Sequence, residues 1–72
     1  MSEELKRKII EILSKGDKTS IQIREELIQL GEEINLIEFR KALADLVREG
    51  VLEKYPVYEE KKFYFRVKGK SH

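Results

Sequence analysis

Residues 39–54 read FRKALADLVREGVLEK. In the first half of this stretch, apolar residues recur every three or four positions, which is the spacing of one face of an α-helix. They are Phe39, Leu43, Leu46 and Val47. Gly50 ends this pattern, and the spacing that follows changes from 3.6 towards 2, which is typical of a strand. The stretch therefore predicts a helix that passes through a glycine stop into a strand.

Two more helices are expected before this one. Apolar residues repeat with helical spacing over residues 3–15, and Gly16-Asp17-Lys18 supplies a turn. Thr19 and Gln22 have the spacing of a capping box, in which each side chain satisfies a free backbone N–H at the start of a helix. This second helix ends at Gly31.

Only a short link, residues 31–34, separates the second helix from the third. Asn35 is a suitable N-cap, with Glu38 at the capping-box position, so we expect the third helix to span residues 35–49. The link contains a glycine, so we expect helices two and three to be close neighbours joined by a turn.

The remainder of the chain predicts two strands. Residues 51–57 are largely apolar, and in residues 63–67 Phe63, Phe65 and Val67 alternate with polar residues, so these three should share the core-facing side. Pro56 has no N–H for a ladder and belongs at an edge or a bulge. We expect a single α+β domain over residues 1–68, three helices followed by a hairpin, with a flexible basic tail at residues 69–72.

The amino-acid composition argues against a metal site, an enzyme and a membrane protein. The 72 residues include no cysteine and one histidine, His72, so neither a thiolate metal site nor a catalytic constellation is expected. We therefore expect no enzyme, no metal or other cofactor and no small-molecule substrate. No apolar run approaches the roughly 18 residues that span a bilayer, and no signal-peptide pattern is present, so we expect a soluble, cytoplasmic protein without membrane association. The abundance of Lys, Glu and Arg is a hint of a thermophilic source.

The net charge of +1 conceals a split along the chain. Residues 1–34 hold six basic and eight acidic residues, whereas residues 35–72 hold nine basic and six acidic residues. From Lys61 onward there are five basic residues and no acidic one. This positive half is suited to attract a polyanion such as nucleic acid.

The order helix, helix, turn, helix, hairpin resembles the winged-helix family of helix-turn-helix domains. The resemblance is carried by Phe39-Arg40-Lys41-Ala42-Leu43, Leu46, Glu49-Gly50-Val51-Leu52-Glu53-Lys54 and Phe63-Tyr64-Phe65-Arg66-Val67. It implies a DNA-binding protein and transcriptional regulator, with helix 35–49 in the major groove of double-stranded DNA and the hairpin 51–68 as a wing on the adjacent backbone. A homodimer on a palindromic site is expected.

Candidate DNA-contacting residues follow from this orientation. If the apolar face of the third helix points inward, its exposed arc carries Ile37, Arg40, Lys41, Ala44 and Arg48, and Asn35 lies at its start. On the wing, alternation sends Lys62, Tyr64, Arg66 and Lys68 to the face opposite the core, and we expect Lys54 and Lys61 to extend that face. Arg40 and Lys41 are the best candidates for base edges or phosphates.

Other interpretations of the same residues remain open. The helix cations could be solvated or pair with Glu38, Asp45 and Glu49, and charges on a hairpin also prevent edge pairing. Leu36, Ile37 and Glu38 depart from the small, polar or basic residues usual at the start of a DNA-reading helix. They favour an alternative, a winged-helix module for protein–protein interaction or a subunit of a larger complex.

Overall fold

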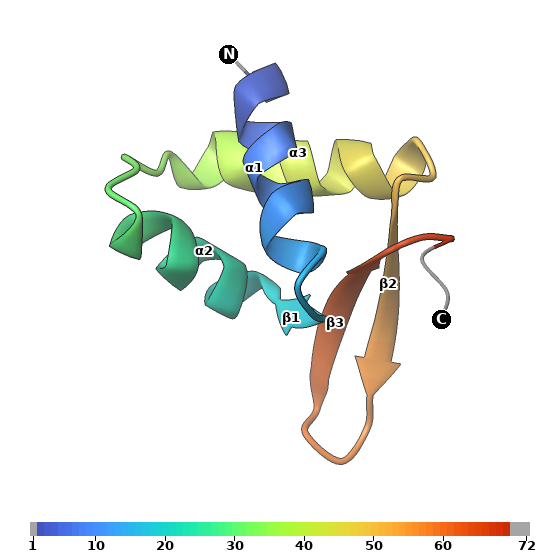
Figure 1. The fold of residues 1–72 in the computed structure, drawn as a ribbon. Coiled ribbons are helices and arrows are strands. Elements are labelled where there is room, and N and C mark those ends of the chain that lie inside the picture. Colours follow the sequence, from blue (N-terminus) through green and yellow to red (C-terminus); the bar gives the residue numbers. More distant parts are fainter. Residues whose placement is uncertain (1, 70–72) are drawn as a thin grey trace.

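The computed structural model describes residues 2–69. The predicted α+β class is confirmed, with three helices and a three-stranded antiparallel sheet in the order β1-β3-β2 (Figure 1). The elements are α1 Ser2–Leu13, β1 Lys18–Thr19, α2 Ser20–Gln29, α3 Leu36–Arg48, β2 Leu52–Val57 and β3 Lys62–Val67. Sequence reasoning missed β1, because two residues are too few to show alternation. The predicted tail lies outside the described residues except for Gly69.

The predicted helix caps are present. The Thr19 hydroxyl accepts a hydrogen bond from the N–H of Gln22 at 3.2 Å, and the Gln22 side-chain oxygen accepts one from the N–H of Thr19 at 3.0 Å. The Asn35 side chain accepts from the N–H of Glu38 at 3.1 Å. These bonds satisfy backbone donors that the first turn of a helix leaves free, and they fix where α2 and α3 begin.

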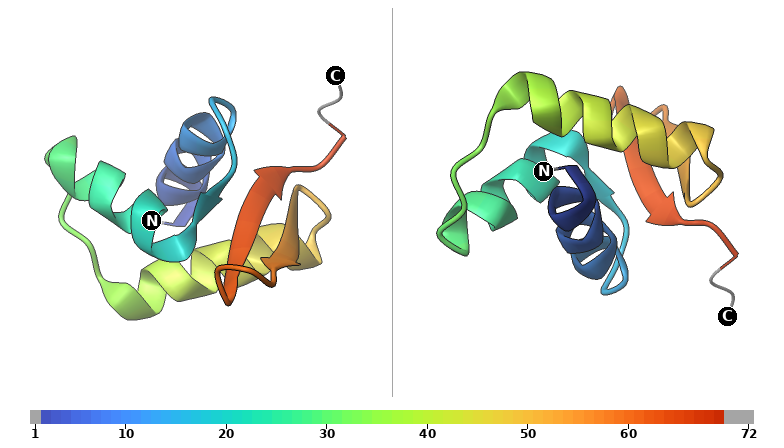
Figure 2. Two further views of the ribbon diagram at one scale, coloured as in Figure 1. Left: turned by 90° about the horizontal axis from the view of Figure 1, so that it is seen from below. Right: turned by 90° about the horizontal axis from the view of Figure 1, so that it is seen from above.

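The core lies where the three helices meet the base of the hairpin. Its largest fully buried side chains are Phe39, Ile9, Leu13, Ile23, Leu27 and Leu52. From α3, Leu43 and Leu46 are buried as predicted, and Val47 is half-buried. Both views in Figure 2 show α3 along one edge of the molecule, with α1 and α2 together on its other side. The opposite long side of α3 is therefore free for contacts.

The hairpin register assigns its side chains to two faces. Lys54 pairs with Phe65 and Pro56 with Phe63, whereas Tyr55 pairs with Tyr64 on the other face. Phe65 is 8% exposed, but Phe63 is 52% exposed, so the prediction that Phe63 faces the core is wrong. The hairpin extends beyond the helices (Figure 1), and its buried residues, Leu52 and Phe65, lie in the half nearer the helices.

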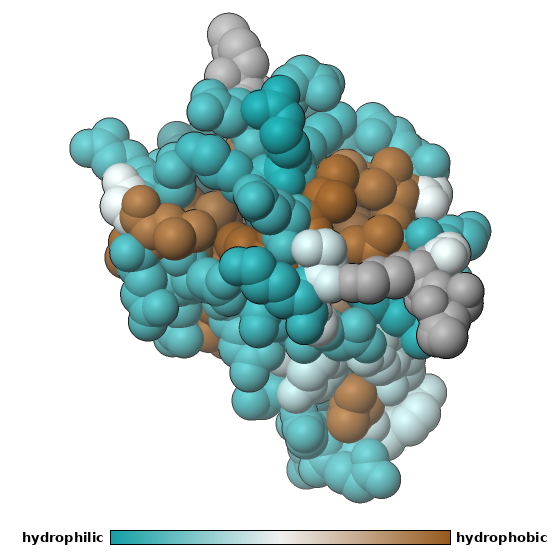
Figure 3. Space-filling model, viewed as in Figure 1, coloured by the Kyte–Doolittle hydropathy of each residue, from teal (hydrophilic) through white to brown (hydrophobic). Residues whose placement is uncertain are grey.

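Polar and apolar residues are mixed on the surface. Figure 3 looks onto α1 and the hairpin, where hydrophobic residues form separate patches on both sides of α1 among hydrophilic ones. Across residues 2–69, no helix has the length and apolarity that crossing a membrane requires.

Candidate nucleic-acid interface

The outward surface of α3 carries the residues that the helical period predicts. Burial of Phe39, Ala42, Leu43 and Leu46 turns the opposite side of the helix to the exterior. The residues on that side are Ile37, Arg40, Lys41, Ala44 and Arg48, and all of them are exposed. The helical part of the predicted site is therefore assembled on one accessible surface.

A hollow of about 400 Å³ separates α3 from the hairpin. Arg40, Ala44 and Arg48 line it from α3, Lys54 from β2 and Ser20 from the start of α2. A second hollow of about 290 Å³ continues towards the hairpin tip, lined by Lys54, Lys62 and Phe63 together with Ile21. Because Lys54 and Ser20 line both, the two hollows form one surface. We call the surface lined by the cationic residues Arg40, Arg48, Lys54 and Lys62 the basic groove. Lys62 pairs with Val57 at the start of β3, on the strand face of Tyr64, and lines this surface only at the second hollow.

The charge of the basic groove is partly offset at Arg48. None of the described residues that line either hollow is acidic. Arg48 forms an ion pair with Asp45, which also lies 3.9 Å from the ammonium of Lys6 on the α1 side of the helix. Lys54 lies over the ring of Phe63, with its Nζ atom 4.6 Å from the ring centroid. This cation–π contact holds the ammonium on the α3 side of the hairpin.

Arg66 and Tyr64 lie on the other face of the hairpin. The guanidinium of Arg66 donates to Glu53 at 2.8 Å and lies 5.1 Å from the ring centroid of Tyr55. Glu53 raises the pKa of Arg66 through this hydrogen bond. The prediction that Lys54 shares a face with Tyr64 and Arg66 is wrong, because the register pairs Lys54 with Phe65.

Several carboxylates lie beside this second face of the hairpin. The Tyr64 hydroxyl donates to Glu60, which raises the pKa of Tyr64, and the Tyr55 hydroxyl donates to Asp17. A hollow beside Tyr64 is lined by Asp17, Glu25 and Glu26, with Lys18 paired to Glu26. The hairpin therefore separates a cationic side from an anionic side.

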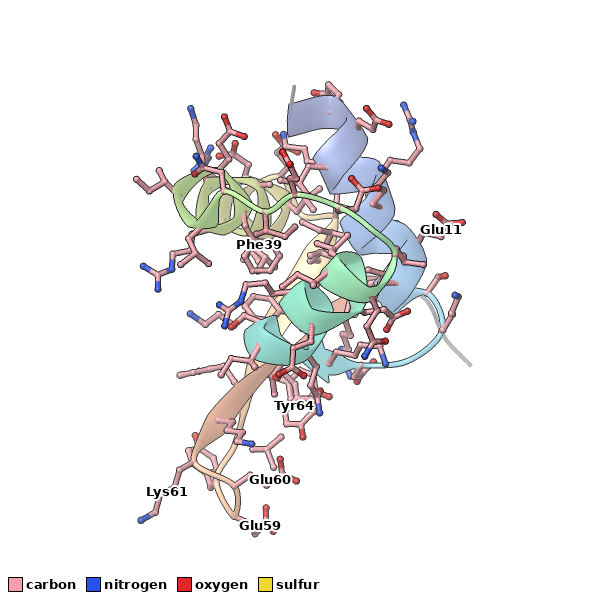
Figure 4. All side chains as sticks on the ribbon, turned by 90° about the vertical axis from the view of Figure 1, so that its left-hand side faces the viewer. Glu11, Phe39, Glu59, Glu60, Lys61 and Tyr64 are labelled. Atoms are coloured by element: carbon pink, nitrogen blue, oxygen red, sulfur yellow. The ribbon has the colours of Figure 1, made fainter. Side chains whose placement is uncertain are left out.

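The other three predicted lysines lie at different places on the molecule. Lys61 lies at the hairpin tip, with a left-handed φ of 56°, and Figure 4 shows its side chain pointing to the α3 side, away from Glu59, Glu60 and Tyr64. Lys41 lies on the outer surface of α3. Lys68 follows β3 at the base of the hairpin, where its N–H donates to the carbonyl of Val51, so it is distant along the strand from Lys62.

Asn35 does not line the basic groove; it caps α3 and lies among acidic residues. Its side-chain oxygen accepts from Glu38 at the cap, and it lines a different hollow with Glu32, Glu33 and Glu38. The structure thus brings together Arg40, Ala44, Arg48, Lys54 and Lys62, and leaves Asn35, Tyr64, Arg66 and Lys68 elsewhere.

Three residues of this surface were missed by sequence reasoning, namely Ser20, Ile21 and Phe63. The capping box at Thr19 places Ser20 and Ile21 in the first turn of α2, but no local pattern indicates that this turn meets the hairpin. Phe63 is adjacent to the turn, a position that favours exposure. Within residues 2–69, no group of three or more His, Cys, Asp or Glu side chains is placed to hold a metal ion.

Comparison with known proteins gives no relative. No protein-family model, no curated protein and no solved structure matches this chain. Function is therefore inferred from the surface itself.

Proposed function

We propose that this chain is a winged-helix DNA-binding domain and acts as a cytoplasmic transcriptional regulator. In this proposal α3 enters the major groove of double-stranded DNA, and the β2–β3 hairpin is the wing on the adjacent backbone. The role is one of binding, without a catalytic step. The observation that carries the proposal is the basic groove, because its cations come from α3, β2 and β3 and converge on one accessible surface.

The dimensions of α3 and of the major groove support this docking mode. The 13 residues of α3 form a rod of about 20 Å, and the major groove, about 12 Å wide, admits one α-helix. The helix lies at the edge of the molecule, so its outer surface can enter a groove without collision from α1 or α2 (Figure 2). Arg40 and Lys41 are then positioned for base edges or phosphates, and Lys54, Lys61 and Lys62 for phosphates.

Local charge, rather than the net charge of the chain, provides the attraction to DNA in this proposal. The net charge is only +1, so attraction to DNA depends on the separation of cations and carboxylates across the hairpin. A surface that contacts about four phosphates predicts a log–log salt slope of about −3.6. Affinity should then fall by about 10²-fold between 50 and 200 mM salt.

The test is a titration of a random-sequence duplex at about 50 and 200 mM salt, followed by fluorescence anisotropy. We expect binding at the lower salt and the steep loss described above. Arg40→Ala and Lys41→Ala should weaken it, whereas Arg7→Ala, which removes the same charge from an exposed position on α1, should not. Absence of binding at low salt, with the fold intact by circular dichroism, would overturn DNA binding.

We also propose that two chains bind together as a homodimer. One domain of this size offers few contacts, and two-fold symmetric proteins match palindromic sites. Tyr58 is exposed and available for an interface, whereas the hydroxyl of Tyr55 donates a hydrogen bond to Asp17. Light scattering of the complex in the same titration gives the stoichiometry, and two chains per duplex are expected.

A protein partner is the second candidate, favoured by a specific observation. Four aliphatic side chains are exposed where α2 ends and α3 begins, namely Ile28, Leu30, Leu36 and Ile37. An apolar interface there should respond little to salt, so the same titration separates the two candidates.

A further inference from the structure

The outermost line of α3 alternates two kinds of side chain. Ile37, Lys41, Ala44 and Arg48 follow one another at intervals of four, three and four residues, which aligns them along the exposed side of the helix. Lys41 and Arg48 carry charge, whereas the side chains of Ile37 and Ala44 have no hydrogen-bonding group. This line therefore combines two cations with two apolar contacts.

Ile37 is the most conspicuous member of this line. It is 79% exposed, although it is a large aliphatic residue, and it is the second residue of α3. In helix-turn-helix proteins, the first residues of the recognition helix contact base edges. The neighbouring carboxylate of Glu38 lines the hollow beside Glu4 and Lys8 from α1, so it lies on another flank of the helix. Ile37 is therefore free to meet a base edge without an acidic neighbour at its side.

The chemistry of the major groove limits what Ile37 can recognise there. Its base edges present hydrogen-bond donors and acceptors, and the one apolar group is the C5 methyl of thymine. An isoleucine set against an unmethylated edge satisfies no polar group and buries no apolar partner. Set against a methyl group, it removes apolar surface of both from water, which favours binding by about threefold to fourfold per methyl.

We propose that Ile37 is a specificity-determining residue that selects C5-methylated pyrimidines, and hence thymine, in the major groove. This inference rests on the proposed function and adds the class of base edge that the protein prefers. In it, Lys41 and Arg48 supply phosphate contacts that carry no preference for sequence.

The test compares duplexes that differ only in the C5 methyl. Four synthetic probes serve: alternating adenine–thymine, alternating adenine–uracil, alternating guanine–cytosine, and alternating guanine–5-methylcytosine. A dinucleotide repeat offers only two distinct registers, and the two members of each pair differ only in the C5 methyl in both, so the unknown target sequence does not matter. We expect the methylated member of each pair to bind about threefold or more tightly, measured by anisotropy at low salt.

Two variants test whether Ile37 is responsible for the preference for methylated duplexes. Ile37→Ser should bring the affinity ratio within each pair close to one, because it removes the apolar contact. Ile28→Ser is the matched control, since Ile28 is also an exposed helical isoleucine, 55% exposed, and lines neither hollow of the basic groove. It should keep the wild-type ratio.

The outcomes separate this inference from the proposed function. Binding of all four duplexes with a ratio of one in the wild type overturns the methyl contact and leaves DNA binding in place. A preserved ratio in Ile37→Ser overturns the role of Ile37. Failure to bind any of the four duplexes overturns both proposals.

Discussion

Phe63 and Phe65 show how much the position of a single residue matters in this chain. They are two residues apart on the same face of β3, yet Phe65 is buried against the helices and Phe63 is exposed over the second hollow of the basic groove. Alternation correctly predicts that they share a face. It cannot predict where along the strand the core ends, because that depends on how far the helices extend beside it.

The core face of α3 is testable at Leu43. This side chain is 5% exposed, so Leu43→Ala removes buried methyl groups and leaves a cavity. The free energy of unfolding should fall by about 2–5 kcal/mol, a large share of the stability of so small a domain. Urea denaturation followed by circular dichroism measures it. Leu30→Ala, at a side chain that is 64% exposed, is the matched control and should change stability little. Equal effects of the two substitutions would contradict the assigned helix face.

At the scale of elements, the hairpin has two faces of opposite chemical character. Lys54 and Phe63 face α3, whereas Arg66 with Glu53, and Tyr55 with Asp17, face the other side. A basic residue on the strand is therefore not by itself a phosphate ligand. Its face and its carboxylate neighbours decide whether its charge is available.

This division predicts different roles for two hairpin cations. Lys62→Ala should weaken binding on all duplex sequences and reduce the salt slope by about one, because Lys62 lines the basic groove. Arg66→Ala should leave DNA affinity nearly unchanged, because that guanidinium is paired with Glu53 and, unlike Lys62, lines neither hollow of the basic groove. Anisotropy titrations at several salt concentrations measure both effects. A loss in Arg66→Ala as large as that in Lys62→Ala would show that DNA contacts are not confined to the basic groove.

Across the whole molecule, the basic groove lies on one side of the hairpin, and Asp17, Glu25 and Glu26 lie on the other, together with the paired Arg66. Contacts between distant parts of the chain hold these regions in place. The Tyr55 hydroxyl contacts Asp17 in the loop before β1, and Lys6 of α1 contacts Glu49 after α3 at 3.1 Å. The stability of the whole domain should therefore depend on their protonation.

The hydrogen bond to Asp17, together with burial, raises the pKa of Tyr55 from 10.0 to about 12. A raised pKa in the folded state means that the neutral phenol stabilises the fold below pH 10, and that this contribution is lost as the pH rises towards 12. Glu49 and Glu32 likewise raise the pKa values of Lys6 and Lys8, which adds to the loss in the alkaline range. We expect the urea midpoint to fall as the pH is raised above 10.

Tyr55→Phe tests the origin of this alkaline loss. It removes the titrating hydroxyl, so the urea midpoint of the variant should depend less on pH above 10 than that of the wild type. Tyr58→Phe, at a tyrosine that is 82% exposed, should keep the wild-type dependence. Identical pH dependence in Tyr55→Phe and the wild type would contradict the assigned role of the Asp17 contact.

The three helices, the caps at Thr19 and Asn35, and the outward side of α3 could be predicted from the order of the residues alone. These features depend on residues within a few positions of one another, where periodicity and backbone hydrogen bonding leave little freedom. Three features required the folded chain: which hairpin face meets α3, which cations are not paired with carboxylates, and the position of Ser20 and Ile21 on the same surface. Those outcomes depend on strand register and on contacts between residues far apart in the chain, for which a linear sequence contains no local signal.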